Sequence, residues 1–338
     1  MGLIAHLKKV LKLAITINNK LKTETQQFKT KTQPSVLSCI VCNSSNREVL
    51  FKEVKDLEYE TYKPVDYALC KDCGLIFQDP LPEVNLLNMF YPPEYRNYLP
   101  IQKSFFSFLK NIQFENLAKQ ITKYLHKDTD VSNLKILDIG FGNGQLLLAL
   151  KTLGYKKLYG CDFTDTMFPV LNNEGLTLKA GNIEKDFPFS ENFDLIIMNN
   201  VIEHFLNPAS VLKKCKGHLS ENGKIILITP NSNALESSVF GKYWAGFHAP
   251  RHTFLFNSKN IELFSKNMGF SKIYIEPIAD PGQWSISIQN IIQDNSLIKL
   301  KLTNGMSWYL IPLSIIVSPI ANIQNLIGKS TSIMCVIK

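Results

Sequence analysis

The stretch KILDIGFGNGQLLLAL, residues 135–150, decides the fold of this chain of 338 residues. A short apolar run is followed by Gly140, Gly142 and Gly144, and then by apolar residues at helical spacing. Glycines between a strand and a helix let the backbone turn sharply, and they let a ligand lie against the main chain. The stretch therefore predicts a buried strand, a ligand-binding turn and a helix.

The segments after this stretch continue to alternate between strand and helix patterns. Apolar runs separated by helical segments begin near residues 136, 158, 176, 193 and 224. NSKNIELFSKNMGF predicts a helix that ends at Gly269, KIYIEP predicts a further strand, and residues 104–126 predict a helix before the glycine turn. This alternation predicts an α/β fold whose sheet is doubly wound and mostly parallel.

The spacing of the glycines bears on which ligand the turn holds. A dinucleotide-binding turn reads G-x-G-x-x-G, and here the third glycine comes one residue too early. Asp162 ends the next strand pattern, close to the ~20-residue offset at which a carboxylate binds ribose hydroxyls. The pattern thus favours a nucleotide-type ligand, weakens the case for NAD, and disfavours a plain strand–helix turn.

Five stretches resemble, in order, the successive motifs of the class I S-adenosylmethionine-dependent methyltransferases: ILDIGFGNGQLLLAL, GCDFTD, AGNIEKDFPF, FDLIIMNNVIEHF and NGKIILITPN. The resemblance covers about residues 134–277. It implies a Rossmann-like methyltransferase fold with a seven-stranded, mostly parallel sheet, and S-adenosylmethionine as the cofactor. This cofactor has no phosphate group, and the glycine turn accordingly contains no lysine.

The resemblance also implies which residues bind the cofactor. They are Asp138, Gly140, Gly142, Gly144, Asp162, Phe163, Asn182, Ile183 and Asn199. Asp138 and the glycines would hold the methionyl part, and Asp162 would bind the ribose hydroxyls.

The remaining matched positions lie after the third and fourth predicted strands. Asn182 and Ile183 would flank the adenine, where the family more often has aspartate in place of Asn182. An amide can also pair with an adenine edge. Asn199 and Asn200 would then lie beside the cofactor.

Methyl transfer from a sulfonium is an in-line displacement, so the protein must mainly align the acceptor with the methyl group. A base is needed only where the acceptor must lose a proton. The candidates are His204 in IEHF and both histidines of FHAPRHTFLF, His248 and His252. Histidine titrates near pH ~6.5, which suits this task. A structural role is the alternative for each of the three.

Two C-x-x-C pairs precede this region and predict a metal site. They consist of Cys39 with Cys42 and Cys70 with Cys73, and each pair is followed by a residue that tolerates a left-handed turn, asparagine or glycine. Four thiolates favour tetrahedral Zn²⁺ with no open position, hence a structural zinc knuckle. Iron of the rubredoxin kind is the alternative. The other three cysteines fall in apolar patterns and are expected to be buried.

The order of these features suggests a substrate class. The four-cysteine segment, CGLIFQDPLP, FYPPEY, the methyltransferase motifs and PRHTFLFNSKNIELFSKNMGF together resemble a bacterial group associated with sugar, polysaccharide or cell-envelope biosynthesis. The resemblance covers most of residues 37–338 and implies a sugar-bearing small molecule or a glycan as acceptor. We expect a basic helix and linker at 1–35, a zinc-binding module at 36–100 and a methyltransferase domain at 101–338.

Two other functions were weighed against this one. A nucleic-acid methyltransferase with a zinc finger is disfavoured, because NNVIEHF stands where base-amine methylating members usually carry a Pro-Pro-aromatic run. A non-catalytic cofactor-binding module is disfavoured by the intact glycine turn and Asp162. We therefore expect a small-molecule or glycan partner and no nucleic acid.

Most of the formal net charge of +8 lies at the N-terminus. Residues 1–35 hold seven lysines and one glutamate, which gives 7 − 1 = +6. Residues 3–21 predict a basic amphipathic helix that packs on protein or touches an anionic membrane. The apolar run MSWYLIPLSIIVSPIANI is too short and proline-rich for a membrane span, so we expect a buried or membrane-touching hairpin. No secretory signal is visible. We expect a cytoplasmic protein, either free or peripheral at the inner face of the membrane.

Overall fold

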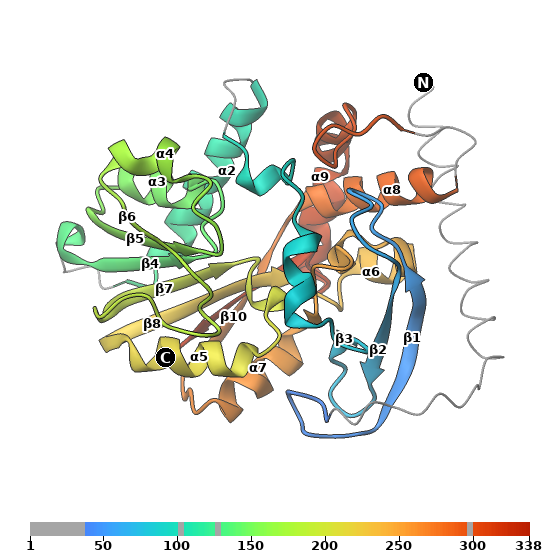
Figure 1. Ribbon diagram of the computed structural model, residues 1–338, viewed down its shortest axis with the longest axis horizontal. Coiled ribbons are helices and arrows are strands. Elements are labelled where there is room, and N and C mark those ends of the chain that lie inside the picture. The colour runs from blue at the N-terminus through green and yellow to red at the C-terminus, as the bar shows by residue number, and fades with distance from the viewer. Residues whose placement is uncertain (1–37, 101–104, 126–129, 296–299) are drawn as a thin grey trace. The chain divides into compact units, whose positions relative to one another are not determined.

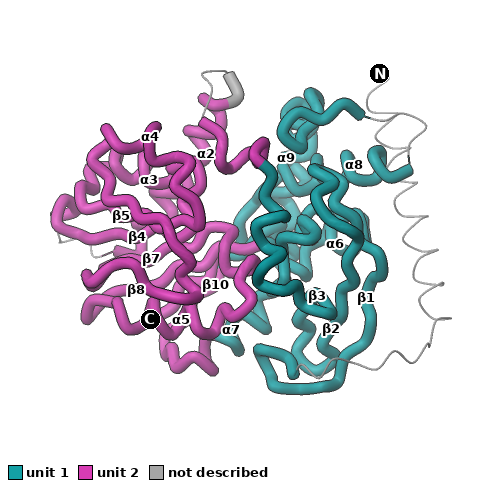
Figure 2. The backbone as a smooth tube through the Cα atoms, in the orientation of Figure 1, with its two compact units in different colours: residues 1–92, 230–264, 276–333 teal, residues 93–229, 265–275, 334–338 magenta. Residues whose placement is uncertain are grey.

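The computed structural model describes residues 38–100, 105–125, 130–295 and 300–338. The chain divides into two compact units, which Figure 2 shows in different colours. Unit 1 comprises residues 1–92, 230–264 and 276–333, and unit 2 comprises residues 93–229, 265–275 and 334–338. The basic helix predicted at 3–21 lies outside the described residues.

Unit 2 is built on a seven-stranded sheet in the order β10-β11-β8-β7-β4-β5-β6. Its strands are β4 (Lys135–Ile139), β5 (Lys157–Asp162), β6 (Thr177–Ala180), β7 (Phe193–Asn199), β8 (Leu219–Pro230), β10 (Ile273–Ile278) and β11 (Ser332–Ile337). β4 pairs in parallel with both β5 and β7, β5 with β6, and β7 with β8. The predicted α/β fold with a mostly parallel sheet is confirmed.

The central strand β7 contains a continuous apolar run, as expected where both faces of a sheet are covered. Leu195, Ile196, Ile197 and Met198 of β7 are all fully buried. In Figure 1, helix α3 (Gln145–Thr152) and helix α5 (Pro208–Gly217) lie on opposite sides of the sheet. The sheet is therefore doubly wound. The shorter helix α4 spans Phe168–Leu171.

The two helices predicted outside this core are both present. The one expected at 104–126 is α2 (Phe105–Thr122), and the one expected before Gly269 is α7 (Ser258–Asn267). Gly269 has a φ of 78°, the left-handed conformation that commonly ends a helix. Local periodicity and capping therefore identified both helices.

Unit 1 contains a four-stranded antiparallel sheet in the order β1-β2-β3-β9. Its strands are β1 (Arg47–Val54), β2 (Val65–Cys70), β3 (Ile76–Gln78) and β9 (Phe254–Leu255). Helices α6 (Leu235–Phe240), α8 (Pro281–Asp294) and α9 (Leu310–Leu326) belong to the same unit. Tyr67, Trp244, Phe247 and Trp284 are among the residues of its apolar core. The second half of the chain thus completes a sheet that the N-terminal segment begins.

The hairpin expected in the apolar run at 306–323 is wrong, because this segment forms the single helix α9 with Pro319 inside it. A proline in a helix loses one backbone hydrogen bond. Here Leu313, Val317 and Ala321 are buried on one side of the helix, and Pro319 lies on the exposed side. Burial of that apolar side offsets the proline. None of the described helices is long and apolar enough to cross a membrane.

Candidate functional site

The glycine turn after β4 has the backbone geometry that the sequence predicts. Gly140, Gly142 and Gly144 have φ values of 72°, 54° and 78°. A Cβ at Gly140 would lie 2.4 Å from Val201 Cγ2, and one at Gly144 would lie 2.7 Å from Leu171 Cδ1. The left-handed conformation therefore favours glycine at both positions, and at Gly140 the close packing of Val201 favours it as well.

Asp162, the last residue of β5, is joined to this turn. Its Oδ2 accepts a hydrogen bond of 2.8 Å from the backbone N–H of Gly142. Burial raises the pKa of Asp162, against backbone hydrogen bonds from Gly142, Phe163 and Thr164 that lower it. The carboxyl group thus forms one wall of the turn, where it can accept hydrogen bonds from a ligand's hydroxyls.

Asp138 of β4 lies behind the turn and is 2% exposed. Its Oδ1 has no hydrogen-bond partner among the described residues. Burial, with a smaller contribution from Asp162, raises the pKa of Asp138 well above its ordinary value. A buried acceptor without a partner, beside a second carboxyl group, favours a cationic or hydrogen-bond-donating ligand. The ammonium and sulfonium groups of S-adenosylmethionine meet that requirement.

The residues expected near adenine follow β6. Gly181 N–H donates to Asp162 O at 2.8 Å, which holds this segment beside the end of β5. Asn182 Oδ1 accepts from the backbone N–H of Glu184 at 2.9 Å, and Ile183 is buried. Phe163 is 51% exposed, an aromatic face available for stacking. The oxygen of Asn182 therefore stabilises a turn, so its amide nitrogen is the atom left to meet an adenine acceptor.

The end of β7 contributes the remaining predicted residues of unit 2. Asn200 has a φ of 54°, and its N–H donates to Ile228 O at 2.8 Å. Its side chain donates to Asn199 Oδ1 at 3.3 Å. A short 3₁₀ helix, Ile202–His204, follows and carries His204, which is half-buried. The strained asparagine thus turns the chain so that His204 follows the strand end directly.

All the predicted cofactor residues lie at one edge of the sheet. They follow or end strands β7, β4, β5 and β6, which are consecutive neighbours. The carboxyl ends of parallel strands meet at the same edge, and ligands of open α/β sheets bind there. The sequence order of the motifs therefore becomes a single spatial site.

Glu203 is a buried acid that the sequence reasoning did not single out. It is fully buried, and burial raises its pKa to about 8, against smaller lowering contributions from its own backbone and from Thr229. Its position directly before His204 in IEHF was the available signal. The carboxyl group is therefore largely protonated at neutral pH in the folded chain.

We expect the Glu203→Gln variant to be more stable than the wild type at pH 8 and similar to it below pH 4.5. The folded pKa of about 8 exceeds the ordinary 4.5, so the folded state binds the proton more tightly, and stability falls as pH rises through this window. The loss is about 1.4 kcal/mol for each pH unit. Urea unfolding across this range measures it. The exposed Glu221→Gln is the control and should leave the free energy of unfolding close to that of the wild type.

The other two histidines belong to unit 1. The Nδ1 of His248 lies 2.7 Å from Glu58 Oε1, and both side chains are buried. His252 is engaged through Nδ1 with Gly246 O at 2.7 Å, and the His248 and His252 ring centroids are 5.2 Å apart. The two rings are therefore neighbours, each oriented by a hydrogen bond at Nδ1. His204 belongs to unit 2.

Asp56 and Arg251 fix the turn that carries Glu58. Arg251 Nη2 lies 2.9 Å from Asp56 Oδ2, and the same carboxyl group accepts from the backbone of Tyr59 and Thr61. Burial alone would raise the pKa of Asp56, but the Arg251 guanidinium lowers it below its ordinary value. Sequence reasoning missed this pair because 195 residues separate its members.

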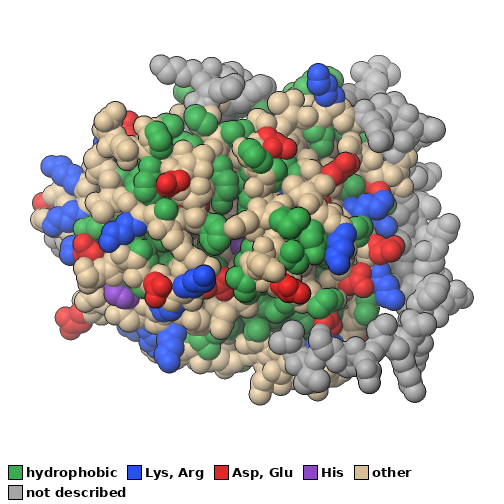
Figure 3. All heavy atoms as spheres, in the orientation of Figure 1, with side chains coloured by type: hydrophobic (Ala, Val, Ile, Leu, Met, Phe, Trp, Pro, Cys, Tyr) green, Lys and Arg blue, Asp and Glu red, His purple; other side chains and the backbone are tan. Residues whose placement is uncertain are grey.

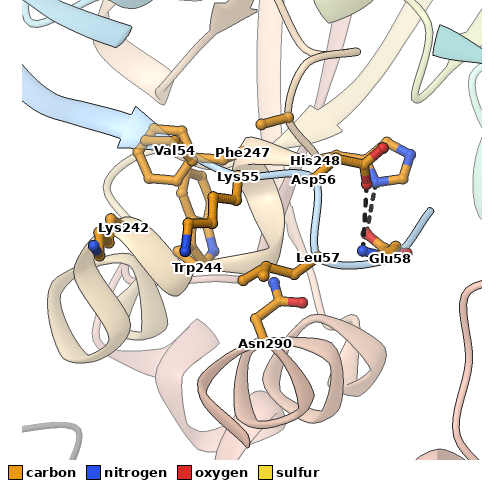
Figure 4. A pocket seen from close by; sticks show the side chains of 11 residues that line it. Val54, Lys55, Asp56, Leu57, Glu58, Lys242, Trp244, Phe247, His248 and Asn290 are labelled. Atoms are coloured by element: carbon orange, nitrogen blue, oxygen red, sulfur yellow. Dashed lines mark hydrogen bonds and ion pairs between the residues drawn. The ribbon is translucent and has the colours of Figure 1, made fainter. Parts of the chain in front are cut away.

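The Glu58–His248 pair lines a small pocket of unit 1 with a volume of about 10 Å³, room for one water-sized group. Figure 4 shows the side chains that line it. Trp244 lies on one side, and Asn290 projects from α8 on another. Trp244 Nε1 and Asn290 Oδ1 are buried and have no hydrogen-bond partner among the described residues. A single hydroxyl group can accept a hydrogen bond from Trp244 Nε1 and donate one to Asn290 Oδ1.

The four predicted metal-ligating cysteines meet in unit 1. Their Sγ atoms all lie within 4.8 Å of one another, with Cys39–Cys73 and Cys42–Cys70 both at 3.5 Å. Sulfurs around a tetrahedral zinc lie about 3.8 Å apart, from a Zn–S distance of ~2.3 Å. A disulfide would need ~2.05 Å. The donor set and its spacing therefore fit zinc.

The two knuckles have matching backbone geometry. Asn43 N–H donates to Cys39 O at 2.8 Å, and Gly74 N–H donates to Cys70 O at 2.9 Å. The turn residues have φ values of 58° at Asn43 and 74° at Gly74. The left-handed residue after each pair is therefore present as predicted. Cys161, Cys215 and Cys335 are buried and lie outside this cluster, also as predicted.

Comparisons with known proteins agree with the geometry of unit 2. Residues 108–275 match the model of a family described as a methyltransferase domain. A ubiquinone biosynthesis O-methyltransferase of Cereibacter sphaeroides is 26% identical over 147 residues, 41% of this chain and 59% of the relative. A tRNA U34 carboxymethyltransferase of Campylobacter hominis is 32% identical over 106 residues, 30% of this chain and 37% of the relative.

The similarity to these curated relatives is partial, since the chain spans about three fifths or less of their length. A crystal structure of a methyltransferase from Archaeoglobus fulgidus has a TM-score of 0.44 and 16% identity, covering 70% of this chain and all of that one. The family match falls on the segment that contains the glycine turn and Asp162. Over residues 108–275 the chain is therefore similar to proteins described as methyltransferases.

Proposed function

We propose that this protein transfers a methyl group from S-adenosylmethionine to a small-molecule acceptor. The observation that carries the proposal is the pair of carboxyl groups at the glycine turn. Asp162 is hydrogen-bonded to Gly142, and Asp138 has a buried oxygen without a partner among the described residues. The ribose hydroxyls of the cofactor can donate hydrogen bonds to Asp162, and its positively charged groups can interact with Asp138. When bound it supplies the methyl group, and alignment of the acceptor lowers the barrier by ~7–11 kcal/mol.

The acceptor we propose is a hydroxyl-bearing molecule such as a sugar nucleotide, a glycan or another cell-envelope precursor. The small pocket of unit 1 could take one hydroxyl group of such a molecule, because the Trp244 donor and the Asn290 acceptor in it have no partner among the described residues. The face in Figure 3 intermixes basic and acidic side chains, and so supports no nucleic-acid partner there.

The test is conversion of labelled S-adenosylmethionine to S-adenosylhomocysteine by the full chain with three acceptor sets: sugar nucleotides, catechols and unmodified tRNA. We expect turnover with the sugar nucleotides. Turnover with catechols or tRNA alone would contradict the acceptor class and leave methyl transfer standing. Cofactor binding without turnover in any set would favour a non-catalytic cofactor-binding module.

We propose His248 as the base for an acceptor that must lose a proton, with His204 and His252 as the other candidates. The hydrogen bond between Nδ1 and the buried Glu58 fixes the ring, as carboxylates do for histidine bases. We expect His248→Gln to lower kcat by ~100-fold or more at neutral pH, with cofactor affinity unchanged.

The matched control for this prediction is His218→Gln, which alters a half-buried histidine stacked on Phe187 at 3.9 Å. Steady-state kinetics on all four histidine variants measure the effect. A loss confined to His204→Gln or His252→Gln would assign the base to that residue instead.

We propose that the four cysteines hold a structural Zn²⁺. Support comes from four thiol groups at tetrahedral spacing and from the two matched knuckles. With all four positions filled by protein sulfurs, the ion would have no place for substrate and would stabilise unit 1. Iron is the alternative metal.

We also propose that the basic segment at 1–35 draws the protein to anionic membranes at the inner face of the cell membrane. Its net charge of +6 supports this, since each basic residue near such a surface adds ~1 kcal/mol of attraction. Association of this kind is reversible and weakens with salt.

A further inference from the structure

One side of helix α9 is apolar and exposed to solvent. Its residues, with those at either end of the helix, form what we call the α9 face: Trp308 (85% exposed), Ile315 (60%), Ile316 (44%), Ile320 (37%), Ile323 (61%), Leu326 (86%) and Ile327 (62%). They recur at helical spacing and therefore share one side. Single exposed apolar residues are ordinary, but a contiguous row marks an interaction site.

The opposite side of α9 is fixed in unit 1 by polar contacts as well as apolar ones. Gln324 Oε1 accepts from Trp284 Nε1 at 3.2 Å, and Gln324 Nε2 donates to Glu236 Oε2 at 3.0 Å. The hydroxyls of Ser314 and Ser285 lie 2.9 Å apart. Rotation of the helix would break these buried hydrogen bonds. The α9 face is therefore held outward.

The charged residues around α9 in the sequence have one sign. Residues 300–338 contain three lysines and no aspartate or glutamate. Lys301 and Lys329 flank the helix in the sequence. Asp294, the last acid before this segment, forms an ion pair with Lys55 at 2.7 Å. An apolar strip with lysines at either end of its segment complements anionic lipid headgroups above acyl chains.

The length and the tryptophan indicate how the helix would meet a bilayer. α9 has 17 residues with one side buried in protein, and no described helix could cross a membrane. Trp308 precedes the helix and is almost fully exposed, and tryptophan prefers the headgroup level of a bilayer. We propose that the α9 face inserts into the surface layer of an anionic lipid bilayer, with the helix parallel to the membrane.

This contact goes beyond the methyl transfer and does not depend on it. It is also separate from the proposed attraction of the basic segment, because α9 contributes apolar insertion and the segment contributes charge. The two contacts predict different responses, since insertion resists salt and charge attraction does not.

The three tryptophans of the chain allow insertion to be observed directly. Trp244 and Trp284 are 1% and 3% exposed, so a change of environment on binding reports Trp308. With vesicles of phosphatidylcholine and phosphatidylglycerol, the full chain should show a blue-shifted emission and quenching by brominated lipid. Trp308→Phe should remove both signals while sedimentation with the vesicles persists. Sedimentation without any blue shift would overturn the proposal.

The second test replaces two residues of the face together, Ile323→Asp and Leu326→Asp. Sedimentation with the same vesicles should fall at least about tenfold, because two buried aliphatic side chains are lost and charge enters the acyl layer. Val84→Asp is the matched control, an apolar residue of unit 1 that is 61% exposed and outside the face. It should sediment like the wild type. Equal melting temperatures of the three proteins confirm that the variants fold.

Deletion of residues 1–30 separates the two contacts. The truncated chain should retain the blue shift and a salt-resistant fraction of vesicle binding. Complete loss of vesicle binding on deletion, with no effect of the Ile323→Asp and Leu326→Asp double variant, would overturn the proposal. It would assign the membrane contact to the basic segment. A dimer in sedimentation velocity that dissociates in the Ile323→Asp and Leu326→Asp double variant, without vesicle binding, would also overturn the proposal. It would identify a second copy of the chain as the partner of the α9 face.

Discussion

Asp162→Ala should weaken the binding of S-adenosylmethionine by roughly 10- to 150-fold. Each hydrogen bond from a ribose hydroxyl to a charged carboxylate contributes ~1.5–3 kcal/mol, and loss of one such bond accounts for this range. The substitution also removes the 2.8 Å hydrogen bond that holds the N–H of Gly142. Calorimetric titration of the full chain with the cofactor measures the change.

Asp165→Ala is the matched control for this variant, because Asp165 lies three residues further along and is exposed. We expect it to bind the cofactor like the wild type. Asp162→Asn should retain part of the affinity, since an amide keeps one acceptor oxygen. Wild-type affinity in a folded Asp162→Ala variant would contradict the role of this carboxyl group. Tight binding of NAD with no binding of S-adenosylmethionine would contradict the cofactor itself.

The sheet of unit 2 was predictable because its signals are local. Each strand is a short apolar run, and the glycine turn lies between a strand and a helix that are adjacent in sequence. The cofactor site was predictable for the same reason. Asp138, Asp162 and Asn199 are strand residues, and parallel pairing determines their neighbours. Periodicity and a resemblance to family motifs therefore suffice for this part of the molecule.

Unit 1 was harder to predict because its contacts join distant parts of the chain. Glu58 and His248 are 190 residues apart, and β9 pairs with β3 from the second half of the sequence. Nothing near either residue indicates its partner. The sequence therefore predicts a self-contained module at residues 36–100. In the structure the sheet of this segment also includes the strand Phe254–Leu255.

One smaller departure has the same origin in tertiary contacts. Pro319 argues locally against a helix, yet α9 continues through it because Leu313, Val317 and Ala321 are buried. Here a local preference competes with contacts that only the folded chain contains.

The largest loss of stability should come from removing one thiolate of the cysteine cluster. Cys70→Ser leaves three sulfurs, and Cys42 Sγ, now 3.5 Å from Cys70 Sγ, loses its neighbour around the ion. Structural zinc contributes its binding energy to folding, and unmetallated knuckles are commonly unfolded. Cys70 also ends β2, the strand that pairs with β1 and β3, so the disturbance should reach this sheet. We expect loss of zinc and a lower melting temperature.

Elemental analysis of the purified full chain should find one zinc ion in the wild type and none in Cys70→Ser. Cys215→Ala is the matched control, because Cys215 is a buried cysteine of unit 2 outside the cluster and should leave the zinc content unchanged. A chelator should lower the melting temperature of the wild type and of Cys215→Ala, and added zinc should restore it. Cys70→Ser should respond to neither. Stoichiometric iron with a visible absorption band would contradict the choice of metal, and a wild-type chain that melts identically with and without chelator would contradict a structural ion.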